Sequence, residues 1–150
     1  MEAKNEDIIL ALLYKVNTPI NYTKLQKLTF LLEKEANITL NLDFVPYKYG
    51  PFSSKIYDIV EELERKSLVE IAQTKMITTQ YGNAKIISIT EKGKLRAMKA
   101  YEEMNKDDRE KLDDIVKRWG HEPLSSLLVY TYLTYPETTK NSLIKDEVLS

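Results

Sequence analysis

Two stretches of the sequence decide the predicted fold: Glu61-Glu62-Leu63-Glu64-Arg65-Lys66-Ser67-Leu68-Val69-Glu70 and Ile87-Ser88-Ile89-Thr90-Glu91-Lys92-Gly93-Lys94. Before Ser67 the apolar residues recur at helical spacing, and after it a short β-branched, alternating segment predicts a strand. The second stretch predicts a returning strand, and Thr90 is a favourable N-cap for the helix that follows. The polar segment between the strands predicts a wing. The order is therefore recognition helix, strand, wing, strand, helix, which is the order of a winged helix.

Apolar spacing on either side of this unit predicts further helices. Two are expected before it, at 7–16 and 22–36, and three after Gly93, ending near Asn105, Trp119 and Leu133. Residues 37–51 form an extended insert that contains aromatic residues and prolines. We therefore predict a mainly α (α+β) fold: a winged helix-turn-helix with a two-stranded wing and a C-terminal helical extension. Residues 1–100 would form the winged-helix domain, and residues 101–150 an extension that packs on it or forms a dimer interface.

The composition excludes several kinds of site. The 150 residues include no cysteine, which excludes disulfides and thiolate chemistry and favours a reducing, cytoplasmic compartment. His121 is the only histidine and the four glycines are scattered, so a histidine metal site, a catalytic triad and a phosphate-binding glycine loop are not predicted. We expect no enzyme activity and no cofactor. No membrane contact is expected either, because no apolar run approaches spanning length.

Charge constrains the binding of double-stranded DNA, because 22 basic and 23 acidic residues give a formal net charge of -1. Phosphate contacts favour a basic surface, so a local patch would have to carry any binding. The candidates at the start of the recognition helix are Ser53, Ser54, Lys55 and Tyr57. The candidates in the wing are Lys75, Thr78, Thr79, Gln80 and Lys85. The second-rank phosphate contacts are Lys24, Lys27 and Lys48, and a solvated helix face is the other interpretation of Lys24 and Lys27.

The two stretches that decide the fold resemble the pattern L-x-x-x-G-L-I-x followed by Y-x-L-T-x-x-G of MarR- and PadR-like winged-helix regulators. Ser67 stands where these families usually have glycine, and Ile87 where they usually have an aromatic residue. The resemblance covers about residues 52 to 95 and implies a DNA-binding regulator.

A second resemblance covers roughly the first half of the chain. Lys24-Leu25-Gln26-Lys27-Leu28-Thr29-Phe30 and Phe44-Val45-Pro46-Tyr47-Lys48-Tyr49-Gly50-Pro51 are similar to the motifs of Panacea-type (SocA-like) antitoxin domains. This resemblance implies a protein partner. Tyr47 and Tyr49 could present hydroxyls to such a partner or anchor the insert as buried aromatic side chains.

Two functional hypotheses follow. The first is a DNA-binding winged-helix transcriptional regulator, in which a homodimer would present two half-sites to a palindrome. The second is a protein-interaction module of the antitoxin or adaptor type that uses the same scaffold to bind a partner protein. The near-neutral charge and the acidic helix around 107–114 favour the second, and the lysines and hydroxyls of the wing favour the first.

Overall fold

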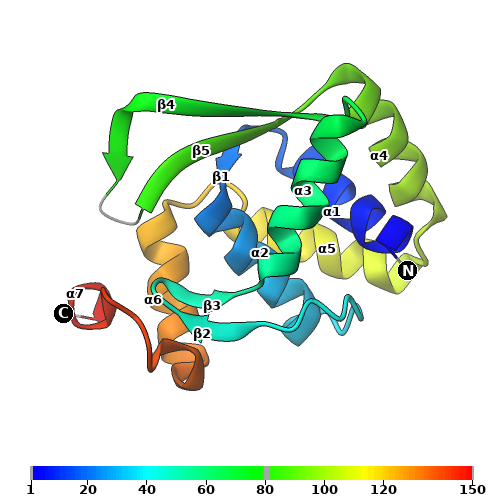
Figure 1. The fold of residues 1–150 in the computed structure, drawn as a ribbon. Coiled ribbons are helices and arrows are strands. Elements are labelled where there is room, and N and C mark those ends of the chain that lie inside the picture. Colours follow the sequence, from blue (N-terminus) through cyan, green and yellow to red (C-terminus); the bar gives the residue numbers. More distant parts are fainter. Residues whose placement is uncertain (1, 80–81, 150) are drawn as a thin grey trace.

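The computed structural model describes residues 2–79 and 82–149, with side chains described for residues 4–73 and 85–149. Its α-helices are α1 (Glu2–Val16), α2 (Tyr22–Glu35), α3 (Ser54–Arg65), α4 (Glu91–Glu103), α5 (Lys106–Trp119), α6 (Leu124–Thr134) and α7 (Lys145–Leu149) (Figure 1). The strands are β1 (Ile20–Asn21), β2 (Val45–Tyr47), β3 (Gly50–Phe52), β4 (Val69–Thr79) and β5 (Gly82–Ile89), and a 3-10 helix, η1, covers Pro136–Thr139. The predicted mainly helical α+β class is confirmed.

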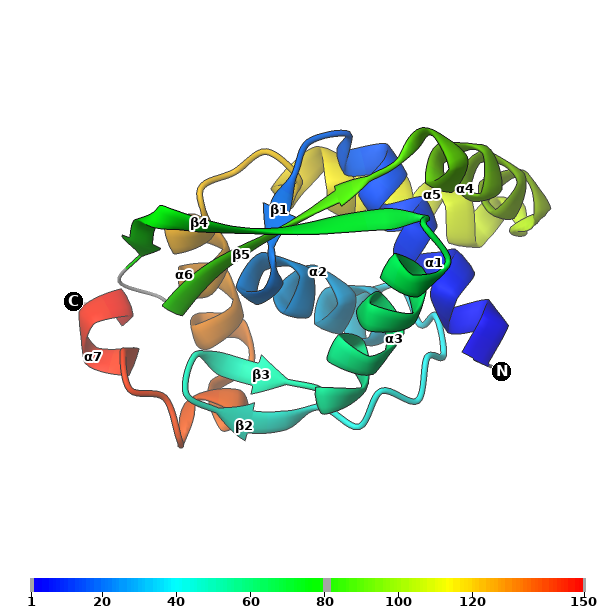
Figure 2. The same cartoon turned by 45° about the horizontal axis from the view of Figure 1, so that its top comes forward.

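Two antiparallel sheets lie on opposite sides of α2. The larger sheet has the order β1-β5-β4, with Ile20 opposite Ile87 and Val69 opposite Ile89. The smaller one is the β2–β3 hairpin, in which Pro46 lies opposite Pro51. Figures 1 and 2 show β4 and β5 along one side of α2 and the hairpin along the other. Helix α2 therefore buries most of its residues, Lys27 included, and the solvated-face interpretation is wrong for Lys27, whereas Lys34 is exposed.

One apolar core joins the N-terminal and C-terminal helices. Leu12 of α1 and Leu28 of α2 are fully buried, and they belong to the same cluster as Leu112 and Val116 of α5 and Leu127 of α6. Burying a side chain of this size contributes roughly 1.5–3 kcal/mol to stability.

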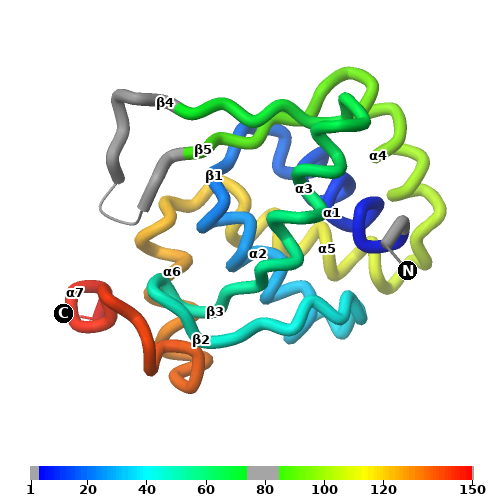
Figure 3. Tube along the Cα trace, viewed as in Figure 1, coloured from blue at the N-terminus to red at the C-terminus, as the bar shows by residue number. Residues whose placement is uncertain are grey.

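Helices α4 and α7 lie at opposite ends of the molecule (Figure 3).

The junction between α3 and β4 brings the two fold-deciding stretches into contact. Ser67 has a left-handed backbone (φ 62°), its N–H donates to the Glu64 carbonyl at 2.9 Å, and the Leu68 N–H donates to the Leu63 carbonyl at 2.9 Å. This is the hydrogen-bond pattern of a Schellman C-cap. The Thr90 hydroxyl donates to the Ser67 carbonyl at 2.7 Å and accepts from the Gly93 N–H at 2.9 Å, as an N-cap does.

Gly93 is required at this junction because α4 begins against the backbone of Leu68, the residue before β4. A Cβ on Gly93 would lie 2.0 Å from the Leu68 carbonyl oxygen. The Thr-x-x-Gly spacing thus combines a helix cap with a close approach of two backbones.

Candidate functional site

The polar residues at the start of α2 hold the strand β3 in place. The Gln26 side-chain amide donates to the Ser53 carbonyl at 2.9 Å and accepts from the Ser53 N–H at 2.8 Å. The ammonium of the next residue, Lys27, donates to the Pro51 carbonyl at 3.0 Å. These side chains satisfy backbone groups that would otherwise be buried without partners. The Lys-Leu-Gln-Lys motif and the Tyr-Gly-Pro motif therefore meet in space.

Lys24 binds a different segment of the chain, the one that follows α5. Its ammonium donates to the carbonyls of Gly120 at 2.7 Å and Glu122 at 3.1 Å, just beyond the C-terminal end of α5. A cation is favoured there because the last carbonyls of a helix lack intrahelical partners. Partial burial lowers the pKa of Lys24, and the carboxylate of Glu122 acts in the opposite direction. Lys24 therefore joins α2 to α5.

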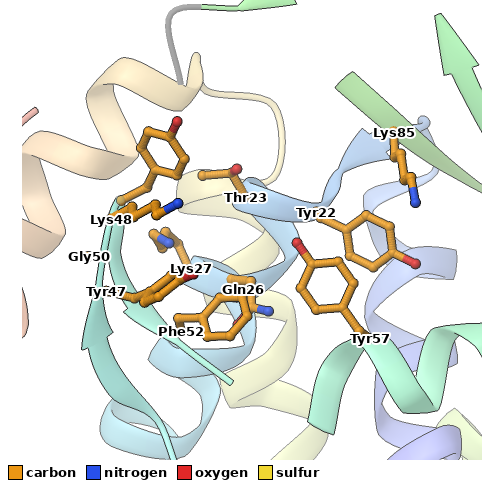
Figure 4. Close-up of a pocket in the computed structure, with 11 residues that line it drawn as sticks. Tyr22, Thr23, Gln26, Lys27, Tyr47, Lys48, Gly50, Phe52, Tyr57 and Lys85 are labelled. Atoms are coloured by element: carbon orange, nitrogen blue, oxygen red, sulfur yellow. The ribbon is translucent and has the colours of Figure 1, made fainter. Parts of the chain in front are cut away.

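A pocket of about 310 Å³ opens beside α2, between the β2–β3 hairpin, the start of α3 and β5 (Figure 4). Its basic residues are Lys27, Lys48 and Lys85. Its tyrosines are Tyr22, Tyr47, Tyr49 and Tyr57. None of the described residues that line the pocket is acidic. The pocket can therefore offer ammonium and hydroxyl donors without a carboxylate of its own to occupy them.

Aromatic rings form one wall of this pocket. Tyr22 stacks on Tyr57 with ring centroids 4.4 Å apart, Tyr57 lies 5.6 Å from Phe52, and Phe52 lies 4.6 Å from Tyr47. Burial, and then the charges of Glu61, Tyr57 and Glu64, raise the pKa of Tyr22 to about 12. Burial is the main cause that raises the pKa of Tyr57, and the electrostatic effect of Tyr47 is the second. Both hydroxyls consequently stay protonated well above neutral pH.

Lys27 lies at the base of the pocket and is only 2% exposed. Burial lowers the pKa of its amine to about 7. Within the described part of the chain, Lys27 forms no ion pair with a carboxylate. The amine therefore changes charge near neutral pH, unlike a surface lysine.

The turn between β2 and β3 is fixed from the C-terminal part of the chain. Gly50 has φ 90°, and a Cβ there would lie 2.8 Å from Cε1 of Tyr132 on α6. The Tyr132 hydroxyl is 2.8 Å from the Ser142 hydroxyl, and the Leu143 N–H donates to the Lys48 carbonyl at 2.8 Å. The sequence analysis missed Tyr132 and Ser142 as residues that position the pocket. Gly50 was the available signal, because a left-handed glycine between aromatic residues often marks a close contact.

The structure brings four of the residues predicted for DNA contact together in the pocket: Lys27, Lys48, Tyr57 and Lys85. Ser53 is buried, with its hydroxyl donating to the Leu42 carbonyl, so Ser53 and Lys27 lie in the interior and not on the expected surface. Ser54 and Lys55 are exposed at the start of α3, and Lys24 is half-buried against α5. Gln80 and the side chains of Lys75, Thr78 and Thr79 lie outside the described residues.

Two further observations limit what the site can do. Among the described residues, no group of three or more histidine, aspartate or glutamate side chains is placed to hold a metal ion. None of the helices in the same part of the chain has the length and apolar character needed to cross a membrane.

The fold and the pocket define a mainly helical α+β domain in which two polar sequence motifs build one basic, aromatic site. The family model described as antitoxin SocA-like, Panacea domain, matches residues 25–134. This chain belongs to that family, and the matched region runs from α2 to the end of α6. No curated protein matches the chain.

Proposed function

We propose that this protein is an antitoxin-type interaction module that binds a partner protein at the β2–β3 hairpin. The observation that carries the proposal is the exposure of two large apolar side chains on β2, Val45 at 51% and Tyr47 at 43%, of which Tyr47 lines the pocket. Exposed aromatic side chains next to a concave basic site are typical of the centre of a protein interface. Membership of the antitoxin-like family supports the same conclusion.

The hairpin is held rigidly, which favours binding. On one side Gln26 and Lys27 bind the backbone around β3, and on the other Asn141 donates to the Pro46 carbonyl at 3.3 Å. The Leu143 N–H likewise donates a hydrogen bond to the Lys48 carbonyl. A surface that is already ordered loses less entropy when a partner binds. The carbonyls of Pro46 and Lys48 already accept these hydrogen bonds and are not free for a further strand. We therefore expect the partner to bind the side chains of the hairpin and not to add a strand to it.

The experiment is co-expression with the product of the gene next to its own, followed by size-exclusion chromatography with light scattering. We expect a stable complex, and Tyr47→Asp should weaken it at least tenfold because it places a charge in the interface. The matched control is Leu95→Asp, since Leu95 is 70% exposed on α4, at the end of the molecule away from α7 and the hairpin turn. Equal loss in both variants, or no complex with either neighbouring product, would contradict the proposal.

DNA binding by a winged-helix regulator is the second candidate. The order α3, β4, β5, α4 favours it, together with the exposure of Ser54 and Lys55 at the start of α3. Against it, Lys55 is paired with Asp43 at 2.5 Å, and the chain has a net charge of -1. In this hypothesis a homodimer would bind two half-sites.

Fluorescence anisotropy with duplexes from beside its own gene, at two salt concentrations, tests this second candidate. Salt-steep binding to one duplex would support it. Lys75→Ala should then weaken binding to all sequences alike, whereas Ser54→Ala should change the preference between sequences. Absence of binding at low salt would remove this candidate.

A further inference from the structure

The pocket concentrates positive charge in a chain that is slightly acidic overall. The chain has 23 acidic and 22 basic residues, yet the pocket has three lysines and, among the described lining residues, no carboxylate. The lysines come from separate elements, Lys27 from α2, Lys48 from the turn after β2, and Lys85 from β5. Figure 4 shows Lys27 and Lys48 on one side of the pocket and Lys85 on the other. The fold therefore brings distant cations to one place without pairing them there.

Lys27 is the most informative of the three. An ammonium has three N–H donors, and the Pro51 carbonyl is the acceptor that the structure shows for Lys27. A buried ammonium with one neutral acceptor is poorly stabilised, because burial removes its hydration and no opposite charge replaces it. An anion that entered the pocket would supply that charge.

We propose that the pocket binds the carboxylate of an aspartate or glutamate side chain that the partner protein inserts, with Lys27 as the counter-ion at the base and Lys48 and Lys85 at the rim. This inference extends the proposed function, because it assigns the chemistry of the partner's central contact. A carboxylate can accept several hydrogen bonds at once, from the ammonium groups and from the tyrosine hydroxyls of the pocket.

The surroundings of the pocket favour a residue of a protein over a free small anion. The exposed ring of Tyr47 lines the pocket, and Val45 is exposed two residues earlier on the same strand; an isolated anion would leave both apolar side chains unused. The volume of about 310 Å³ exceeds what a carboxylate alone occupies and accommodates neighbouring atoms of a peptide. An acidic side chain flanked by apolar residues matches both properties.

Binding should be coupled to the uptake of a proton. The titratable groups that line the pocket together with Lys27 are Tyr22 on α2, Tyr47, Lys48 and Tyr49 on the hairpin, Tyr57 on α3 and Lys85 on β5. Of these, Tyr22 and Tyr57 have raised pKa values and stay neutral near pH 8. The pKa of Lys27 is about 7 in the free protein, and a bound carboxylate would raise it. The affinity should therefore fall close to tenfold per pH unit above about pH 8.

The test uses a terminally blocked hexapeptide with a central glutamate between leucines, and the same peptide with glutamine. Isothermal titration at pH 8, in two buffers with different ionisation enthalpies, gives both the affinity and the proton uptake. We expect the glutamate peptide to bind at least tenfold tighter, with uptake of nearly one proton. Lys27→Met should remove the preference and the uptake, whereas Lys34→Met, an exposed lysine on the same helix, should change neither.

Other outcomes would overturn the inference. No preference for glutamate at millimolar peptide would do so, and so would tighter binding of inorganic phosphate or acetate than of the peptide. If Lys27→Met does not fold, the double variant Lys48→Gln and Lys85→Gln should still lower the affinity at least fivefold. A partner complex that forms equally well with these pocket variants would overturn the inference and leave the proposed function standing. Failure of the partner to bind at all would contradict the proposed function, whereas the peptide titration decides separately whether the pocket binds a carboxylate.

Discussion

Gln26 and Ser53 are joined by two hydrogen bonds in which the side-chain amide of Gln26 takes the place of a neighbouring strand. The amide meets both the carbonyl of Ser53 at 2.9 Å and its N–H at 2.8 Å. Both residues are buried, so water cannot replace these bonds. The hairpin is thereby attached to α2 directly before α3 begins.

Replacement of Gln26 by methionine should destabilise the protein by about 2–4 kcal/mol, because two buried backbone groups lose their partners. Urea denaturation measures the free energy of unfolding, and hydrogen exchange at the Ser53 amide should accelerate. Gln73→Met is the control, since Gln73 is exposed on β4 and should change stability by less than about 0.5 kcal/mol. Equal effects at the two positions would contradict this account.

Ser67→Gly should stabilise the protein by about 0.5–1 kcal/mol. Ser67 has φ 62°, a conformation that costs a residue with a side chain roughly 1–2 kcal/mol and glycine almost nothing, although glycine loses more backbone entropy on folding. Thermal unfolding should show a higher Tm. Ser125→Gly, in the exposed face of α6, should give no gain. A loss of stability in Ser67→Gly would show that the serine side chain stabilises this turn.

Stability should rise with pH above neutrality because of Lys27. Its folded-state pKa of about 7 lies below the usual 10.5, so between these values the unfolded chain holds a proton that the folded chain has released. The unfolded state binds more protons there, and the free energy of unfolding therefore increases with pH, by at most ~1.4 kcal/mol per unit. Above pH 10 the raised pKa of Tyr22 acts in the opposite direction.

Urea denaturation at pH 7, 8 and 9 checks this dependence. Lys27→Met should have a flatter profile over this range, and Lys34→Met should retain the profile of the unsubstituted protein. A profile that is equally steep in Lys27→Met would assign the dependence to another group.

Glu6→Gln should destabilise the protein by about 1–3 kcal/mol. The Glu6 carboxylate is 6% exposed and pairs with Lys66 at 2.9 Å and with Arg96 at 3.0 Å, so it joins α1 to the end of α3 and to α4. Removal of this buried charge takes away the ion pair of Lys66 and leaves Arg96 paired with Asp7 alone. Glu91→Gln is the control, because the Glu91 side chain is 91% exposed and its pair with Lys94 should contribute little. Chemical denaturation of the two variants should separate them clearly.

The sequence predicted the elements that depend on local chemistry. The cap at Thr90 was expected and is present, since capping needs only a side-chain acceptor within three residues. The strands of the β2–β3 hairpin were expected only as an extended insert, because three-residue strands that contain Pro46 and Pro51 show no alternation.

The candidate site was predicted only in part, because a local sequence pattern does not show which distant residues come together. Lys27, Lys48, Tyr57 and Lys85 were chosen as separate DNA contacts, and the structure collects them in one pocket. Their convergence depends on the enclosure of α2 between two hairpins, which the 3.6-residue pattern of one helix does not reveal. The contact of Tyr132 with Gly50 depends on residues 82 positions apart, and only the folded chain shows it.

The contacts of Lys24 have a consequence for the order in which the chain can fold during synthesis. The carbonyls that its ammonium binds lie 96 and 98 residues further along the chain. Contacts of such long sequence separation form late, since a large loop must close first. The helix that carries the family motif therefore gains its last polar partners only after α5 has left the ribosome.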